Sequence, residues 1–405
     1  MSCAIISVYP FPYGMAATNR IVAYSKGLVH ENVNVNIFIP IPLHRTTEIG
    51  IKNLPDQGEF EGINYDYVTG KFSSKWKIFR MASILTGFRF FNGFFKTCKA
   101  LIRVNNRNRL DALIISTDDL KILFAFSMAA KFIRVPSIFI FDEFPTPIRH
   151  KLKNKIPGWK NYFYKIILKN FTGYVSISEE LREYYNSICK RETLILPIIT
   201  DTSRFENLDL KRLKKEQRKY LCYMGNMELT KDNVDLIIKA FALIEGKYPT
   251  IDLHLYGQPH EQTQIYLKKL VRNFKLDNRI YFNGRVSSQF VPEILNNAYV
   301  LVSSQPDSKR ASGGFPTKLG EYLVSGTPSL FTNVGENAIF AQDEKHLYFC
   351  PPDDPKLYAS KLDFILSNYK EAKVVAENGR QLIVDNYSHK AMGKKLRNFI
   401  NQINQ

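Results

Sequence analysis

Short apolar segments alternate with helix-like segments along almost all of the 405 residues, and this alternation restricts the fold more than any other feature. The first half of the chain contains AIISVYP, VNVNIFIPI, DALIIST, PSIFIFDEFP, GYVSIS and TLILPIIT, and the second half contains YLCYMG, IDLHLYG, RIYFNG and YVLVSS. Strands of a parallel sheet are buried on both faces, so they appear as continuous apolar runs with helices between them. The pattern therefore predicts an α/β fold made of doubly wound parallel sheets.

A polar, charged stretch near residue 200, TDTSRFENLDLKRLKKEQRK, separates the two sets of segments. We therefore expect two Rossmann-like domains, over 1–200 and 201–387, with a last helix over about 388–405. Ligands of such folds bind at the carboxyl ends of the strands, which predicts a central cleft faced by both sheets. Asp354 followed by Pro355 is typical of a helix start, and Asp118 and Asp119 are interpreted as loop or cap residues.

The net charge of +18 is concentrated in part at 71–110, where ten basic residues and no acidic one are interleaved with aromatic residues. This composition suits an anionic partner with an apolar part, such as a lipid leaflet or a lipid-linked phosphate. An ordinary helix with its aromatic residues in the core is an equally simple interpretation. No nucleic-acid-binding motif accompanies the charge, so no nucleic-acid partner is expected.

Five scattered cysteines, no signal-peptide pattern and no long uncharged apolar window favour a cytoplasmic protein. The stretch 71–110 could bring it into peripheral contact with the inner face of the membrane. The seven histidines have no metal-ligand spacing, and no metal site or cofactor is expected.

Two loops of the second half are candidate ligand contacts. Gly225 and Asn226 leave the strand YLCYMG, and Lys231 stands before the next helix, where a cation and free backbone N–H groups favour a phosphate. Lys231 could equally be a solvated loop lysine. After the strand RIYFNG, Arg285 and Val286 could offer backbone groups to a planar base.

The segment SGGFPTKLGEYLVSGTPS at 312–329 is the most informative candidate. Its glycines allow the backbone to approach a ligand, and its helix start would present N–H groups to an anion. A glutamate one turn into that helix can accept two hydroxyl hydrogen bonds from a ribose, although it could also only stabilise the helix dipole. The candidate residues are Gly313, Gly314, Phe315, Pro316, Thr317 (as N-cap), Lys318, Leu319 and Glu321.

The first half offers residues for a second substrate. Gly14, Met15, Asn19 and Arg20 follow the first strand, and Asp142 and Glu143 follow the strand in PSIFIFDEFP. A carboxylate at such a strand end can position or activate a hydroxyl group, although a helix cap is an alternative role.

In their order along the chain, YMGNMELTKDNVDLIIKAFALI, LHLYGQP, IYFNGRVSSQFVPEILNNAYVLVSS and GFPTKLGEYLVSGTP resemble the retaining glycosyltransferases of family four (glycosyl transferases group 1), which have the GT-B architecture. The resemblance implies a hexosyltransferase-type enzyme (EC 2.4). By this resemblance, the glycine-rich loop and the helix after it would bind the diphosphate of a nucleotide-sugar, and Glu321 would bind the ribose. The tail helix would cross back onto the first domain.

The resemblance also implies which residues catalyse transfer to a glycan acceptor. Lys231, Glu321 and Glu143 would be the catalytic residues, and the leaving phosphate would take the acceptor proton without a metal. A lipid-linked acceptor in bacterial surface polysaccharide synthesis would suit the basic stretch. The chain departs from the family at Gly313, where a first glutamate is often found, and at Asn226, where an arginine is common.

Two other functions fit the same residues. One is another GT-B activity, either an inverting transferase or a sugar-nucleotide epimerase. The other is a non-catalytic glycan or membrane adaptor built on a GT-B frame, which would bind no nucleotide.

Overall fold

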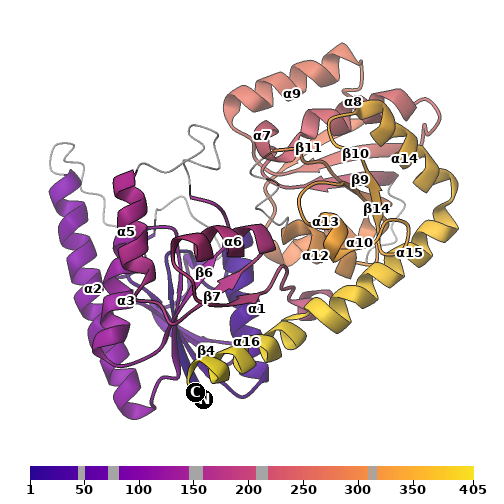
Figure 1. Ribbon diagram of the computed structural model, residues 1–405. Helices are drawn as coiled ribbons and strands as arrows, with labels where there is room; N and C mark the ends of the chain where they lie inside the picture. The colour runs from indigo at the N-terminus through magenta and orange to yellow at the C-terminus, as the bar shows by residue number, and fades with distance from the viewer. Residues whose placement is uncertain (44–50, 72–81, 146–157, 207–217, 309–310, 312–316) are drawn as a thin grey trace. The chain divides into compact units, whose positions relative to one another are not determined.

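The computed structural model describes residues 1–43, 51–71, 82–145, 158–206, 218–308, 311 and 317–405. The chain folds into two compact units, one of Met1–Asp201 with His389–Gln405 and one of Thr202–Ser388 (Figure 1). The boundaries expected from the sequence, 200/201 and 387/388, each lie one residue before these.

The first unit contains a sheet of eight strands in the order β3-β4-β2-β1-β5-β6-β7-β8. All neighbouring strands are parallel except β3 and β4. Every residue of the central strands β1 and β5 is buried, as the continuous apolar runs predicted. The strands are β1 (Ser2–Ser7), β2 (Asn34–Ile39), β3 (Gln57–Phe60), β4 (Ile63–Tyr67), β5 (Ala112–Ser116), β6 (Ser137–Phe141), β7 (Gly173–Ser176) and β8 (Glu192–Ile195).

The hairpin of β3 and β4 was not expected from the sequence. Its strands are polar and its outer strand is partly exposed, so neither has the apolar run of a central strand. Glu61 and Gly62 join them with φ angles of 48° and 79°. Two residues with positive φ form the tight turn that antiparallel hairpins prefer, so the Glu-Gly pair was the signal available in the sequence.

The helices of the first unit are α1 (Ala16–His30), α2 (Ala82–Arg107), α3 (Leu120–Phe132), α5 (Gly158–Leu168), α6 (Glu179–Ile188) and α16 (His389–Ile403). Because crossovers between parallel strands are right-handed, α1 covers one face of the sheet and α2, α3, α5 and α6 cover the other (Figure 1). The C-terminal helix α16 packs against α1, where the backbones meet at Gly27 and Gly393. A Cβ on Gly393 would lie 2.3 Å from the carbonyl carbon of Gly27, so this crossing requires glycine.

The second unit contains a sheet of six parallel strands in the order β11-β10-β9-β12-β13-β14. Its strands are β9 (Lys219–Met224), β10 (Ile251–Tyr256), β11 (Ile280–Gly284), β12 (Val300–Ser303), β13 (Ser329–Thr332) and β14 (Tyr348–Cys350). Its α-helices are α7 (Leu229–Asp232), α8 (Val234–Ile244), α9 (Glu261–Asn273), α10 (Val291–Asn297), α12 (Thr317–Val324), α13 (Asn337–Phe340), α14 (Pro355–Ser367) and α15 (Tyr369–Leu382). Two 3-10 helices, η2 (Thr202–Phe205) and η3 (Ser288–Phe290), and a π-helix, η4 (Ile383–Tyr387), complete the unit.

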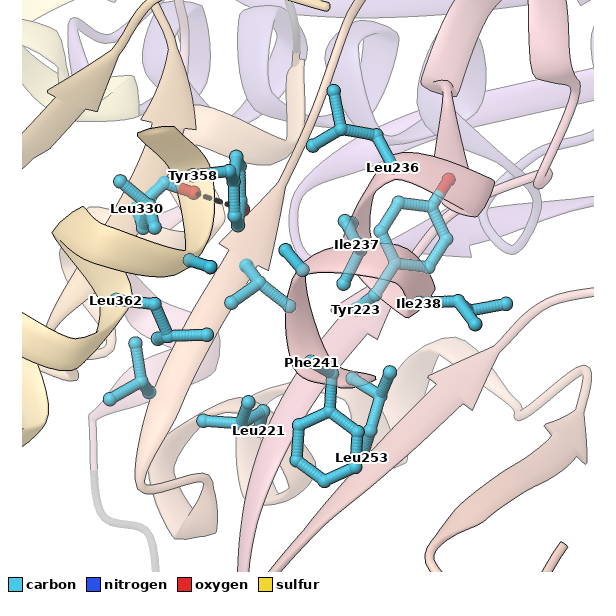
Figure 2. Close-up of a cluster of buried hydrophobic side chains, with 14 of the residues drawn as sticks. Leu221, Tyr223, Leu236, Ile237, Ile238, Phe241, Leu253, Leu330, Tyr358 and Leu362 are labelled. Atoms are coloured by element: carbon cyan, nitrogen blue, oxygen red, sulfur yellow. Dashed lines mark hydrogen bonds between the residues drawn. The ribbon is translucent and has the colours of Figure 1, made fainter. Parts of the chain in front are cut away.

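The core of the second unit lies where α8 and α14 pack on the sheet (Figure 2). Phe241 of α8 and Leu253 of β10 are buried there beside residues of β9. The hydroxyl of Tyr358, on α14, donates to the carbonyl oxygens of Ser303 and Leu330 at 3.2 and 3.3 Å. This core fixes β9 and β12, whose ends carry the candidate ligand loops.

The helix start predicted at Asp354 is confirmed. The carboxylate of Asp354 accepts hydrogen bonds from the backbone N–H groups of Lys356 and Leu357 at 2.8 and 3.1 Å. Asp119 caps α3 in the same way, which confirms its interpretation as a cap residue. Within the described residues, no helix is both long and apolar enough to cross a lipid bilayer.

Candidate functional site

The carboxyl ends of β9, β10, β11 and β12 lie at one edge of the second unit's parallel sheet. Because β9 lies between β10 and β12, the loop after β9 is flanked by the loops that follow those two strands. Gly225, Asn226 and Lys231 follow β9, and Arg285 and Val286 follow β11. Five predicted nucleotide-binding residues therefore share this edge, with the side chains of Asn226 and Arg285 exposed.

Gly225 and Gly257 make a close backbone contact at this edge. The N–H of Gly225 donates to the carbonyl of Tyr256 at 3.0 Å, and the N–H of Gly257 donates to the carbonyl of Gly284 at 2.8 Å. Gly257 has a φ of 141°, and a Cβ there would lie 1.7 Å from the carbonyl oxygen of Gly225. The path of the backbone at Gly225 thus depends on a second glycine that was not anticipated.

An ion pair joins α12 to α7 beside Gly225. The ammonium nitrogen of Lys318 lies 2.7 Å from Oδ1 of Asp232, whose side chain is 3% exposed. The same nitrogen lies 4.6 Å from the ring centroid of Tyr223 and 3.0 Å from the position of a Cβ on Gly225. The carboxylate of Asp232 therefore holds the Lys318 ammonium at the end of β9.

The pKa of Asp232 lies below its ordinary value. Burial opposes the charged form of this carboxyl, but the positive charge and hydrogen bond of Lys318 outweigh it. The Lys231 ammonium and a hydrogen bond from Tyr223 act in the same direction. Lys231 lies in α7 directly before Asp232, so the positive charges of two lysines act on this one carboxylate.

Replacing Asp232 by asparagine is expected to destabilise the second unit by about 3 kcal/mol at neutral pH, because the Lys318 ammonium would lose its buried counter-charge. A carboxyl group whose pKa is lower in the folded state stabilises the fold fully above its unfolded-state pKa. This stabilisation is lost as the pH falls through the folded-state pKa. The difference between wild type and variant should therefore shrink below about pH 3.8. Urea unfolding as a function of pH measures both effects.

Asp277→Asn is the matched control, because the Asp277 carboxylate is 58% exposed and lies 3.9 Å from an exposed Arg272. An exposed pair of this kind contributes about 0–1 kcal/mol. Equal losses of unfolding free energy in the two variants would show that the Lys318–Asp232 pair stabilises the unit no more than an exposed ion pair does.

Helix α12 is fixed to the end of β9 by a tyrosine. The backbone N–H of Met224 donates to the hydroxyl oxygen of Tyr322 at 2.8 Å, and Tyr322 and Leu319 are buried. Thr317, expected as the N-cap, is the first residue of α12. The side chain of Thr317 and the predicted residues Gly313, Gly314, Phe315 and Pro316 lie outside the described residues.

Glu321 is held by an arginine that the sequence analysis did not identify. The guanidinium nitrogen Nη1 of Arg204 lies 2.5 Å from Oε1 of Glu321, whose side chain is 23% exposed. Nη2 of Arg204 donates to the carbonyl of Ser288 at 2.8 Å, which fixes the guanidinium from the other side. Arg204 lies in η2, 117 residues before Glu321, and no sequence motif marks it.

The structure pairs two predicted residues of the first unit with each other. Arg20 of α1 is buried and forms an ion pair with Asp142, which directly follows β6. Burial opposes the charged form of Arg20, but the Asp142 carboxylate outweighs it and raises the pKa of the guanidinium. This pair therefore ties α1 to the end of β6.

The other predicted residues of the first unit lie near this pair in sequence. Gly14 is buried and Met15, the N-cap residue of α1, is 46% exposed. Asn19 and Glu143 are partly buried, and Glu143 follows Asp142 at the carboxyl end of β6. Within the described ranges, no three His, Cys, Asp or Glu side chains gather as metal ligands would.

Several solved structures share this architecture over nearly the full chain. Sucrose-phosphate synthase from Thermosynechococcus elongatus superposes with a TM-score of 0.71 and 16% identity, covering 99% of this chain and 98% of that one. A glycosyltransferase from Rickettsia africae has a TM-score of 0.71 and 15% identity, with coverages of 99% and 98%. The fold is GT-B. Anabaena HepE in complex with UDP-glucose has a TM-score of 0.69 and 11% identity, with coverages of 99% and 100%.

A family model matches part of the chain by sequence. Residues 204–402, slightly less than half of the chain, match the family model of glycosyl transferases group 1. No curated protein matches the chain by sequence. The matched region begins at Arg204 and contains the whole edge described above, from Gly225 to Glu321.

Proposed function

We propose that the chain is a retaining glycosyltransferase that moves a sugar from a nucleotide-diphosphate sugar to a glycan acceptor. The observation that carries the proposal is the edge of the second unit's sheet, within the region of group 1 similarity. There Gly225 and Lys231 follow β9, Tyr322 of α12 accepts a hydrogen bond from Met224 at the end of β9, and Glu321 precedes Tyr322 on α12. The HepE structure in complex with UDP-glucose supports a nucleotide-sugar donor by analogy of fold.

In the proposed reaction, cationic and backbone groups stabilise the leaving diphosphate. Lys231 supplies a positive charge, and the first N–H groups of α12 supply hydrogen bonds with the positive end of the helix dipole. These groups balance the charge that develops as the glycosidic bond to the diphosphate breaks. We therefore propose that no metal is required, and activity should persist in excess chelator.

Glu321 is proposed to accept hydrogen bonds from the ribose hydroxyls. Arg204 holds one carboxylate oxygen of Glu321, Oε1, and thereby orients the group. Because Arg204 also bonds the carbonyl of Ser288, it keeps the carboxylate in one position before the nucleotide arrives. Arg204 is in this sense a positioning residue.

The acceptor is proposed to bind to the first unit, where Glu143 lies at the end of β6. The acceptor hydroxyl would attack from the same side as the leaving diphosphate, which takes the proton and retains the anomeric configuration. A lipid-linked glycan of a bacterial surface polysaccharide, met at the cytoplasmic face of the membrane, is the proposed acceptor. NMR of the product decides the stereochemistry, and an inverted linkage or an epimerised nucleotide-sugar would refute retention.

Glu321→Ala is expected to weaken binding of the cognate nucleoside diphosphate by about 1.5–3 kcal/mol, because a charge-assisted hydrogen bond to the ribose is lost. Calorimetry with UDP and GDP measures the change. Glu377→Ala is the matched control, because Glu377 is 62% exposed on α15 of the same unit. If Glu321→Ala binds as tightly as the control, Glu321 does not contact the nucleotide; if the wild type binds no nucleotide, the adaptor function is favoured.

A further inference from the structure

Three helices of the first unit pack side by side on one face of its sheet: α2, α3 and α5 (Figure 1). The rings of Phe94, on α2, and Phe126, on α3, lie 5.4 Å apart between centroids. The side-chain amide of Asn170, just beyond α5, donates to the hydroxyl of Ser127 on α3 at 3.4 Å. The three helices therefore form one layer, called here the three-helix face.

The outer side of α2 is apolar. Phe91 and Phe95 are 60% and 66% exposed, and Ile102 is 39% exposed. These residues stand at i, i+4 and i+11, so they line one stripe of the helix. Phe94 packs inward instead, so α2 presents aromatic residues on both sides and the core does not account for its composition.

The other two helices repeat this arrangement. On α3, Phe124, Met128 and Phe132 stand at i, i+4 and i+8 and are 47%, 43% and 83% exposed. On α5, Tyr162 and Ile166 stand at i and i+4 and are 65% and 37% exposed, next to an exposed Phe163. Among the described residues of the first unit, every exposed large apolar side chain after Met15 lies on these three helices.

The helices of the three-helix face carry only positive charge, whereas acidic residues lie beside them on α6 (Glu179–Ile188) and at Asp66 of β4. The sequences of α2, α3 and α5 contain no aspartate or glutamate. Exposed basic residues flank the apolar stripes: Lys96, Lys99 and Arg103 on α2, Lys121 and Lys131 on α3, and Lys165 on α5. Contiguous exposed apolar residues mark an interaction surface, and the surrounding charge identifies an anionic partner.

We propose that the three-helix face docks on the surface of an anionic phospholipid bilayer. Aromatic and aliphatic side chains would enter the boundary between headgroups and acyl chains, while the lysine and arginine side chains reach the lipid phosphates. A second copy of the chain fits less well, because a two-fold interface would place basic residues against basic residues. The face includes α3 and α5 as well as the basic stretch on α2 that the sequence indicated.

The test is sedimentation of the full chain with vesicles of phosphatidylcholine alone or with phosphatidylglycerol. The chain should bind the phosphatidylglycerol vesicles, and binding should weaken as NaCl rises from about 0.05 M to about 0.5 M. Reversing the charge of Lys96, Lys99 and Arg103 with glutamate should lower the partition coefficient roughly 100-fold at low salt. Replacing Phe91, Phe95 and Phe132 with serine should lower it at least about tenfold.

Matched control variants come from the second unit. Lys345, Lys356 and Lys370 are exposed and are changed to glutamate together; Leu243, Ile339 and Val374 are exposed and are changed to serine together. Both controls should bind vesicles as the wild type does, and circular dichroism checks that each variant is folded.

The proposal fails if the wild type does not bind anionic vesicles or if the variants of the three-helix face bind like their controls. It also fails if light scattering shows that the chain instead self-associates through this face. Nucleotide binding, measured by calorimetry, does not depend on vesicle binding, so the membrane proposal can fail while the proposed glycosyltransferase function stands.

Discussion

Replacement of Lys231 by alanine is expected to lower kcat by about 10²–10³-fold, while the affinity for the nucleotide-sugar changes much less. The proposed role of the ammonium is to balance charge that develops on the diphosphate as the sugar leaves, and a group of this kind acts mainly in the transition state. The structure supports a cationic environment here, because Lys231 contributes to the lowered pKa of Asp232 and lies in α7 just beyond the end of β9.

The measurement is the steady-state release of nucleoside diphosphate, with the donor chosen as the nucleotide-sugar that most raises the Tm of the wild type. Lys231→Arg, which keeps the charge, should retain more activity than Lys231→Ala. Lys345→Ala is the control, because Lys345 is exposed in the same unit. An unchanged kcat in Lys231→Ala would remove Lys231 from the catalytic residues.

Replacement of Gly257 by alanine is expected to destabilise the second unit by more than about 4 kcal/mol. The added Cβ would lie 1.7 Å from the carbonyl oxygen of Gly225, and the φ of 141° is unfavourable for any side chain. Either the backbone of Gly225 moves or β10 shifts against β9. Both outcomes displace the loop that carries Lys231, so nucleotide affinity should fall together with stability.

Gly246→Ala is the control for this substitution. No heavy atom lies within 4 Å of the position of its Cβ, so its effect should stay within about 0.5 kcal/mol. Chemical denaturation of both variants, with calorimetry of the fraction that folds, measures the difference. A stable Gly257→Ala variant with wild-type affinity would show that the contact of Gly225 with Gly257 is not required.

The elements of the fold were largely accessible from the sequence, because periodicity and caps are local properties. Continuous apolar runs predicted the buried central strands β1 and β5, and Asp354 marked the start of α14. The hairpin of β3 and β4 was missed, because its polar strands lie at the edge of the sheet and carry no buried run. Local patterns thus identify the strands that the core requires better than those at the edge.

The site was only partly accessible for a related reason. Candidate residues at strand ends could be named from the sequence, because parallel strands direct their carboxyl ends to one edge. The partners of those residues could not. Arg204 meets Glu321 across 117 residues and Lys318 meets Asp232 across 86 residues, and Arg20 is paired with Asp142.

The sequence by itself determined two sets of alternating strands and helices and the glycine, lysine and glutamate positions of the candidate nucleotide site. Only the tertiary structure decided which charged groups neutralise one another and which aromatic residues of α2 face outward beside those of α3 and α5. The reason is physical. Backbone hydrogen bonding and side-chain periodicity act over a few residues, whereas the meeting of distant side chains depends on strand order and helix packing, which local patterns do not encode.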